Sequence, residues 1–162
     1  MIPIPGTAPD GSVLYTRYLS GLRGASGSLV FPHALTNGEQ AREAVSLLRE
    51  TLSNQPDKSV VLIQIGPSTN LSRLLDTRAD VHSDLDGLEP VKKKVRFLAV
   101  MAGVFDDVSG FGQTYRRGTP EANILMDIGS AQRLFESWPT ELIASGLEIG
   151  ASIVFPGCHL PA

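Results

Sequence analysis

The segment VVLIQIGPSTNLSRLL, from Val60 to Leu75, constrains the fold of this chain more than any other stretch. Its first six residues are almost all aliphatic and rich in β-branched side chains, a pattern typical of a parallel strand covered on both faces. A Gly-Pro pair ends the strand, and Thr69 or Asn70 then caps a helix over Leu71–Leu75. Because ligands of open α/β sheets bind beyond the carboxyl ends of the strands, Thr69 and Asn70 are candidate site residues.

Two more segments of strand length follow in the chain, Val95–Met101 and Glu141–Ser145. Between them, the apolar spacing predicts a helix over Ser130–Ser137 with Asp127 as its N-cap. This alternation indicates an α/β fold, an open and mostly parallel Rossmann-like sheet with right-handed crossovers and helices on both faces. The residues of this helix that we expect to face inward are Ala131, Leu134 and Phe135.

A further helix is predicted ahead of the first strand. Thr36-Asn37-Gly38-Glu39 matches a capping box, in which the threonine caps the backbone and the glutamate reaches back to it. Apolar residues recur at helical spacing as far as Leu52, and Asn54 and Pro56 end the helix. By contrast, residues 1–30 are punctuated by proline, glycine and serine, which predicts an irregular N-terminal segment.

The composition is that of an ordinary globular protein. Of its residues, 42% are hydrophobic and 19% are charged. With 162 residues, the chain is long enough for residues 1–162 to form a single α/β domain with its own core. A net charge of -3 gives no reason to expect binding to nucleic acid or to a membrane surface. No apolar run is long enough to span a bilayer and no signal sequence is recognisable, so a soluble, cytoplasmic protein is the default expectation. The single cysteine, Cys158, excludes an internal disulfide bond.

Three polar segments could bind a ligand. Asp76–Leu88 contains four aspartates, which suits calcium, but the EF-hand spacing is absent and a solvated loop is the alternative. Asp106–Thr119 is a long, glycine-containing loop of the kind that often covers a binding site. Glu121 and Asn123 lie two residues apart, so in an extended segment both face one side and suit hydrogen bonds to sugar hydroxyls. An ordinary surface position is the alternative for this pair.

Three segments, in order along the chain, resemble motifs of one enzyme family. GPSTNL (Gly66–Leu71) is similar to G-P-L-T-N-L, and VRFLAVMAGVF (Val95–Phe105) is similar to a strand that ends in V-M-G-G. PEANILMDIGSAQRLFESWP (Pro120–Pro139) is similar to E-F-N-x-x-x-D-P-x-A-A. These are motifs of the nucleoside hydrolases, calcium-dependent enzymes that cleave the N-glycosidic bond of ribonucleosides. The resemblance extends from about residue 31 to about residue 150.

The resemblance implies a role for each matching residue. Thr69 would give its backbone carbonyl to a bound Ca2+ ion, with Asn70 beside it in the substrate site. Met101 would line the ribose pocket, and Glu121 and Asn123 would bind ribose hydroxyls. A ribonucleoside is therefore the expected ligand.

Other features of the family are missing from this sequence. Ala102 stands where the family usually has glycine, and Ala122 where it has phenylalanine. The aspartate-rich motif D-T-D-x-G-x-D-D, which supplies most calcium ligands and the general base, does not occur. A hard cation needs about six to eight oxygen ligands, of which Thr69 would provide one. We therefore assign no catalytic residue in this chain.

The chain thus resembles the middle portion of a nucleoside hydrolase, an incomplete domain that is either truncated or diverged. The complete enzyme is expected to hydrolyse ribonucleosides to ribose and free base through an oxocarbenium-like transition state. This chain alone is expected to be inactive. The alternative is a non-catalytic pseudoenzyme that binds ribose without the metal. An exposed apolar sheet edge favours self-association, so a homo-oligomer is expected.

Overall fold

The computed structural model describes residues 19–35, 38–110 and 113–153 of the chain. It divides the chain into two compact units, Met1–Arg42 and Glu43–Ala162. The predicted capping residues Thr36 and Asn37 fall outside the described residues, as does Cys158.

The described part of the first unit is built around a turn. Arg23 and Leu29 form an isolated antiparallel bridge, and Gly27 adopts the left-handed backbone conformation (φ 79°) between them. The guanidinium of Arg23 donates a hydrogen bond to the Gly27 carbonyl at 2.8 Å, which closes the turn. A short 3-10 helix, η1 (Gly38–Gln40), comes later in this unit.

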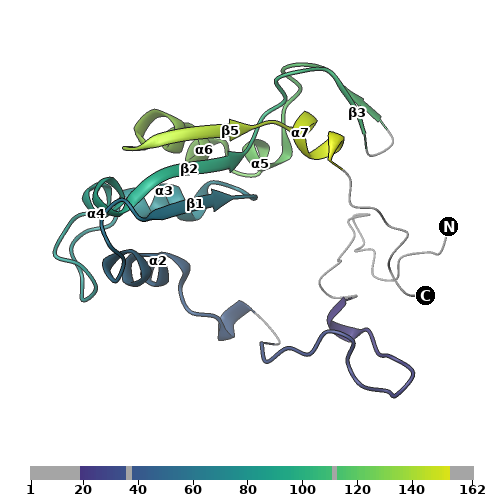
Figure 1. Ribbon diagram of the computed structural model, residues 1–162, viewed down its shortest axis with the longest axis horizontal. Helices are drawn as coiled ribbons and strands as arrows, with labels where there is room; N and C mark the ends of the chain where they lie inside the picture. Colours follow the sequence, from purple (N-terminus) through teal and green to yellow (C-terminus); the bar gives the residue numbers. More distant parts are fainter. Residues whose placement is uncertain (1–18, 36–37, 111–112, 154–162) are drawn as a thin grey trace. The chain divides into compact units, whose positions relative to one another are not determined.

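The second unit contains a three-stranded parallel sheet (Figure 1). Its strands are β1 (Val60–Gln64), β2 (Val95–Met101) and β5 (Glu141–Ser145), in the spatial order β1-β2-β5. All three lie where the apolar runs predicted them. The parallel α/β class of fold is therefore confirmed.

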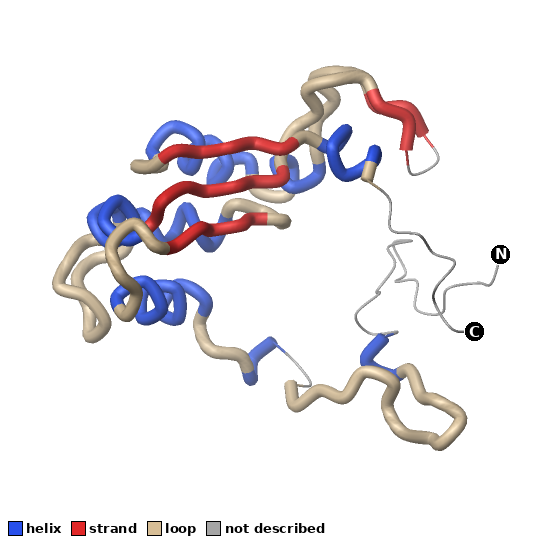
Figure 2. Tube along the Cα trace, in the orientation of Figure 1, coloured by secondary structure: helices blue, strands red, loops and turns tan. Residues whose placement is uncertain are grey.

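Helices connect and cover these strands, and a hairpin follows the central one. The helices are α2 (Ala44–Ser53), α3 (Thr69–Leu75), α4 (Leu88–Lys94), α5 (Ala122–Leu125), α6 (Ile128–Ser137) and α7 (Leu147–Ser152). The hairpin consists of β3 (Val108–Gly110) and β4 (Gln113–Tyr115), within the segment that was expected to be a loop. Figure 2 shows this hairpin beyond the end of the sheet. No helix among the described residues is long and apolar enough to cross a membrane.

Two helices begin at other residues than predicted. Helix α2 starts at Ala44, where the carboxylate of Glu43 caps it by accepting a hydrogen bond from the Ser46 amide at 2.8 Å. The predicted start in a capping box with Glu39 is wrong, because Glu39 belongs to η1. Helix α3 starts at Thr69 itself, so neither Thr69 nor Asn70 is its N-cap.

Helix α6 agrees closely with its prediction. Asp127 is its N-cap and accepts a hydrogen bond from the Ser130 amide at 3.0 Å, and Trp138 ends it. Leu134 and Ala131 are buried as expected, whereas Phe135 is exposed. The expectation of an inward-facing Phe135 is therefore wrong.

The sheet has one covered face and one open face among the described residues. Leu98 and Val100 of β2 are buried in one cluster with Leu74 of α3 and Leu134 of α6. On the opposite face, Val61 and Ile63 of β1 and Ile143 of β5 are exposed. The cover on both faces that the apolar run of β1 predicted is therefore not found here, because an apolar run shows that a strand can be buried but not what covers it.

A buried arginine organises the connection from α3 to β2. Arg49 of α2 is only 1% exposed, and its guanidinium contacts the loop between α3 and α4. Its Nε donates to Asp80 Oδ2 at 2.6 Å, and its Nη2 donates to Asp80 Oδ1 at 3.1 Å. Further hydrogen bonds reach Thr77 Oγ1 at 2.8 Å and the carbonyls of Ser83 and Leu85, each at 3.0 Å. A buried charge needs this degree of pairing to be tolerated.

The Arg49–Asp80 pair makes stability depend on pH. The hydrogen bond from Arg49 lowers the pKa of Asp80 from its usual 3.8 to about 2. A carboxyl group whose pKa is lower in the folded state stabilises that state above the unfolded pKa, and this stabilisation is lost as pH falls through the folded value. We expect the urea midpoint of the wild type to fall between about pH 4 and pH 2 more steeply than that of Asp80→Asn, since the amide does not titrate. Equal slopes in the two proteins would contradict this assignment.

Gly87 gives a second stability prediction. A Cβ atom at this position would overlap the Leu74 carbonyl oxygen and would lie 2.7 Å from Thr77 Oγ1. Gly87→Ala should therefore lower the free energy of unfolding by about 1–3 kcal/mol, as overpacking in a tight site does. Gly129→Ala in α6 is the matched control, because nothing lies within 4 Å of the added Cβ. Urea denaturation of both variants measures the difference, and equal stabilities would refute the packing argument.

Candidate functional site

Thr69 lies at the turn that links β1 to α3. The side-chain amide of Gln64, the last residue of β1, donates a hydrogen bond to Ser68 Oγ at 3.0 Å, and both residues are buried. Thr69 follows directly and is the first residue of α3. Its hydroxyl donates to Asp127 Oδ2 at 2.6 Å. The turn therefore presents Thr69 to the start of α6.

Asp127 joins the two helices at this point. One carboxylate oxygen accepts the Thr69 hydroxyl, and the other accepts the Ser130 amide. The hydrogen bond from Thr69, followed by those from Ser130, lowers the pKa of Asp127 below its usual value. The amino ends of α3 and α6 are thus held together by a single ionised side chain.

Asn123 and Met101 meet at the carboxyl end of β2. The Asn123 side-chain amide donates to the Met101 carbonyl at 3.1 Å and lies equally close to the Met101 sulfur. The donor to that carbonyl must be the amide nitrogen, so the orientation of the Asn123 side chain is fixed. Asn123 and Met101 are both partly exposed. Two residues that the sequence analysis assigned to ribose contacts therefore touch one another.

Glu121 is positioned differently from its prediction. It is 7% exposed, and its carboxylate accepts hydrogen bonds from the amides of Asn123 and Ile124 at 2.9 and 3.3 Å. A third amide, from Gly103, lies at 3.5 Å. The prediction that Glu121 and Asn123 share one face of an extended segment is therefore wrong. Glu121 is the N-cap of α5, and Asn123 is inside that helix.

Gly103, just after β2, adopts a backbone conformation that suits glycine and links two strand ends. Its φ of 85° lies in the left-handed region, which glycine adopts without strain. Its carbonyl accepts the amide of Leu147, the first residue of α7, at 2.9 Å. The carboxyl ends of β2 and β5 are therefore joined through the residue that also approaches Glu121.

The placement of Asn70 is less informative. It is exposed in the first turn of α3, and its side chain makes no hydrogen bond within the described part of the chain. The structure thus brings Thr69 into contact with Asp127, and Asn123 into contact with Met101 and Glu121. Asn70 faces solvent. The roles of these residues in binding a substrate stay predictions.

A comparison with models of known protein families identifies the family of this chain. The model of the inosine-uridine preferring nucleoside hydrolases matches residues 8–159, which is nearly the whole chain. The chain belongs to this family. A comparison with curated proteins gave no match. The parallel α/β fold of this nucleoside hydrolase homologue agrees with the family assignment.

The calcium site implied by the resemblance does not fit the described residues of this family member. Across residues 19–35, 38–110 and 113–153, no three histidine, cysteine, aspartate or glutamate side chains are grouped so that they could hold a metal ion. Asp127 is the acidic side chain in contact with Thr69, and both of its oxygens accept hydrogen bonds. Asp107, after β2, is bound by the Arg116 guanidinium at 2.6 Å and the Arg117 amide at 2.8 Å. These side chains serve as hydrogen-bond acceptors within the protein.

The hairpin covers a cavity beside Glu121. Its volume is about 280 Å³. Gln113 and Tyr115 of β4 line it, together with apolar residues that include Ala122 and Leu125 of α5. A phenylalanine in place of Ala122, as in the family pattern, would add bulk to the wall of this cavity. The segment after β2 therefore lines a hollow, and that it covers a binding site stays a prediction.

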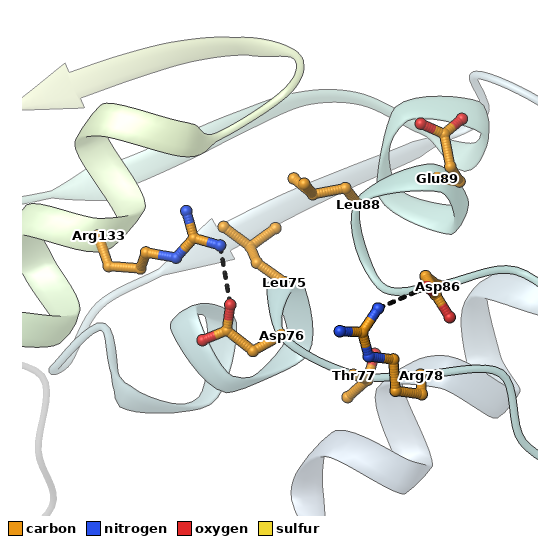
Figure 3. A pocket seen from close by; sticks show the side chains of 8 residues that line it. All are labelled: Leu75, Asp76, Thr77, Arg78, Asp86, Leu88, Glu89 and Arg133. Atoms are coloured by element: carbon orange, nitrogen blue, oxygen red, sulfur yellow. Dashed lines mark hydrogen bonds and ion pairs between the residues drawn. The ribbon is translucent and has the colours of Figure 1, made fainter.

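The acidic segment after α3 lines a second hollow, shown in Figure 3. This cleft of about 450 Å³ is lined by residues from the end of α3, the start of α4 and Arg133 of α6. Arg133 pairs with Asp76 at 2.8 Å, and Arg78 pairs with Asp86 at 2.9 Å. Asp80 pairs with Arg49, so three of the four aspartates in this segment each pair with an arginine and do not form a calcium loop.

The Thr69–Asp127 contact is the feature that sequence reasoning missed. Each residue was singled out separately, one as a cap and ligand and the other as a helix cap. They are 58 residues apart, and only the parallel order of the strands brings them together. A signal was present, because Thr69 follows the carboxyl end of β1 and Asp127 caps the helix that leads into β5. In a parallel sheet the helices that connect strands begin at the carboxyl edge.

Thr69→Val tests this contact. The substitution removes the hydroxyl that hydrogen-bonds the charged form of Asp127, so the pKa of Asp127 should rise toward its usual value. The urea midpoint at pH 7 should fall as well, and the difference from the wild type should disappear at acid pH, where the carboxyl group is protonated in both. Carboxyl NMR titration measures the pKa. Thr114→Val, which removes an exposed hydroxyl from β4, is the control. An Asp127 pKa unchanged in Thr69→Val would exclude the proposed coupling.

Proposed function

We propose that this chain carries a ribose-binding part of a nucleoside hydrolase, and that the complete enzyme hydrolyses the N-glycosidic bond of ribonucleosides. The family assignment supports the reaction class. The observation that carries the proposal is the orientation of Asn123 at the end of β2. Sites in open α/β sheets lie at such strand ends, which gives this residue a place where a ligand can reach it.

The side-chain oxygen of Asn123 can accept a hydrogen bond from a ligand. Its amide nitrogen donates to the Met101 carbonyl, which turns the side-chain oxygen away from that bond. In the described part of the protein, this oxygen makes no hydrogen bond, and the residue is partly exposed. A ribose hydroxyl is a donor of suitable size and strength. We therefore assign Asn123 the sugar contact and Met101 the neighbouring apolar surface.

In this proposal Glu121 acts as a positioning residue. Its carboxylate holds the backbone amides of Asn123 and Ile124, so it fixes the turn of α5 that presents the asparagine. The residue is nearly buried, which leaves little room for direct contact with a sugar. Thr69 and Asp127 support the same edge by holding α3 against α6.

The second candidate is a non-catalytic module that binds ribose without a metal. It is favoured by the hydrogen bonds within the site, which engage the available carboxylates of Glu121 and Asp127. Calorimetry with inosine and uridine, with and without calcium, separates the two candidates. Binding that needs calcium supports the hydrolase, and equal binding in its absence supports the module.

Asn123→Ala tests the assigned sugar contact. We expect binding of inosine or uridine to weaken by about 1–3 kcal/mol, the range for losing a polar contact to a ligand. Gln132→Ala is the matched control, since its side-chain amide bonds the exposed Glu136 on α6. Isothermal titration calorimetry measures both. Equal affinities for the wild type and Asn123→Ala would show that the sugar does not contact this residue.

We further expect the chain by itself not to release free base from nucleosides. Cleavage of a ribosyl bond needs a general base for the attacking water, and the family motif that carries it does not occur in the sequence. The assay incubates the purified chain with inosine, uridine or adenosine at millimolar calcium and measures free base. Turnover that a chelator abolishes would show that a metal site exists outside the groups identified above.

A further inference from the structure

The turn after the hairpin carries two neighbouring arginines and a threonine. Arg116, Arg117 and Thr119 lie between β4 and α5, outside any helix or strand. The two arginines are exposed, and Thr119 is partly exposed. In the whole sequence, Thr119 is the only serine or threonine with arginines both three and two residues before it. The turn therefore combines a hydroxyl group and two guanidinium groups in a short exposed segment.

The two guanidinium groups are open to a partner. Arg116 pairs with Asp107 at 2.6 Å, but both side chains are exposed, and exposed ion pairs are weak. The backbone amide of Arg117 donates to Asp107 at 2.8 Å, whereas its guanidinium makes no hydrogen bond or ion pair within the described part of the chain. A guanidinium in an exposed turn can bind a carboxylate or a phosphate.

The Thr119 hydroxyl is available for reaction. Its oxygen accepts a hydrogen bond from the Arg116 amide at 3.1 Å, and the Thr119 amide donates to the Arg116 carbonyl at 2.9 Å. These bonds close the turn without the hydroxyl proton, and the hydroxyl donates no hydrogen bond to the described residues. A protein that binds this turn can therefore reach a hydroxyl that is not engaged as a donor.

We propose that Thr119 is a phosphorylation site for a protein kinase that selects arginines three and two residues before its target. Kinases choose substrates by such charge patterns, because acidic pockets beside the active site pair with the guanidiniums. In the transfer, the Thr119 hydroxyl oxygen forms a bond to the γ-phosphorus of ATP, and the bond from that phosphorus to ADP breaks. The hydroxyl proton passes to the catalytic aspartate of the kinase. The site is independent of the ribose contact proposed above.

The residue after Thr119 offers another way to recognise this turn, because kinases of a different class select a proline there. Pro120 lines the cavity together with Leu125 and Leu147, so the fold already uses it. The guanidinium of Arg117 has no such role in the described structure. The contacts therefore favour recognition through the arginines.

A phosphate on Thr119 would find a partner in the same turn. It would add about −1.5 to −2 charges at pH 7, two residues from the unpaired guanidinium of Arg117. Arginine and phosphate form strong charge-assisted hydrogen bonds. We therefore expect the modification to create an ion pair next to the segment that leads into Glu121.

Phosphate transfer to the purified, folded chain tests the site. The probe is the catalytic subunit of a cyclic-AMP-dependent protein kinase with magnesium and ATP, and intact mass measures incorporation. We expect one phosphate per chain in the wild type and in Thr119→Ser, and none in Thr119→Ala. Thr114→Ala is the matched control and should retain the phosphate, because Thr114 is exposed in the same hairpin without an arginine before it. Circular dichroism verifies that each variant is folded.

Two variants test how the turn is recognised. Arg117→Gln should lower kcat/KM for transfer by at least about tenfold, since a hydrogen bond from a charged group is lost. Pro120→Ala keeps both arginines and should still be phosphorylated. Phosphorus NMR then measures the second pKa of the phosphothreonine, which should lie below about 6 in the wild type and nearer to 6 in Arg117→Gln.

Each part of the proposal can fail separately. Transfer that does not occur on the folded wild type, or that persists in Thr119→Ala, would overturn the site. A rate unchanged in Arg117→Gln, or transfer lost in Pro120→Ala, would overturn recognition through the arginines. Equal phosphate pKa values in the wild type and Arg117→Gln would overturn the ion pair.

Discussion

The helical layer depends on the hydrogen bonds that the buried guanidinium of Arg49 makes. Because this charge is buried, it must be paired, and its partners are distributed along the segment between α3 and α4. That segment sets where α4 begins and therefore where β2 enters the sheet. Gly87 completes the same turn, since its amide donates to the Thr77 carbonyl at 2.9 Å where no side chain would fit. A polar segment that looks like a solvated loop is thus part of the packed structure.

At the other end of the strands, polar groups have a different function. Asp127 and Glu121 both accept hydrogen bonds from backbone amides at helix starts, and each also contacts a residue from another element. Their charges are therefore used to fix the geometry of this edge of the sheet. Asn123 combines a fixed orientation with partial exposure. This contrast is why we assign the asparagine, and not the glutamate, the contact with the sugar.

The strands were predictable because β-branched runs bounded by turn residues are a local signal. The N-cap at Asp127 was predictable for the same reason, since cap and helix are adjacent in sequence. The start of α2 was missed because a capping box at Glu39 and a cap at Glu43 are both compatible with the local pattern. The open face of the sheet was missed because the aliphatic run of β1 is the same whether one or two layers cover it. The pairing of Thr69 with Asp127, and the burial of Arg49, depend on contacts between distant segments that no local pattern encodes.

The cap formed by Glu121 has a consequence for how order and ligand binding are linked. Helix α5 has only four residues, which is too short to be stable without its cap and its tertiary contacts. The same carboxylate approaches the amide of Gly103, whose carbonyl holds the start of α7. A ligand that contacts Asn123 must therefore bind the state in which this short helix is formed. The free energy needed to order the helix would then reduce the observed binding free energy. Affinity at this edge is in that sense a measure of local folding.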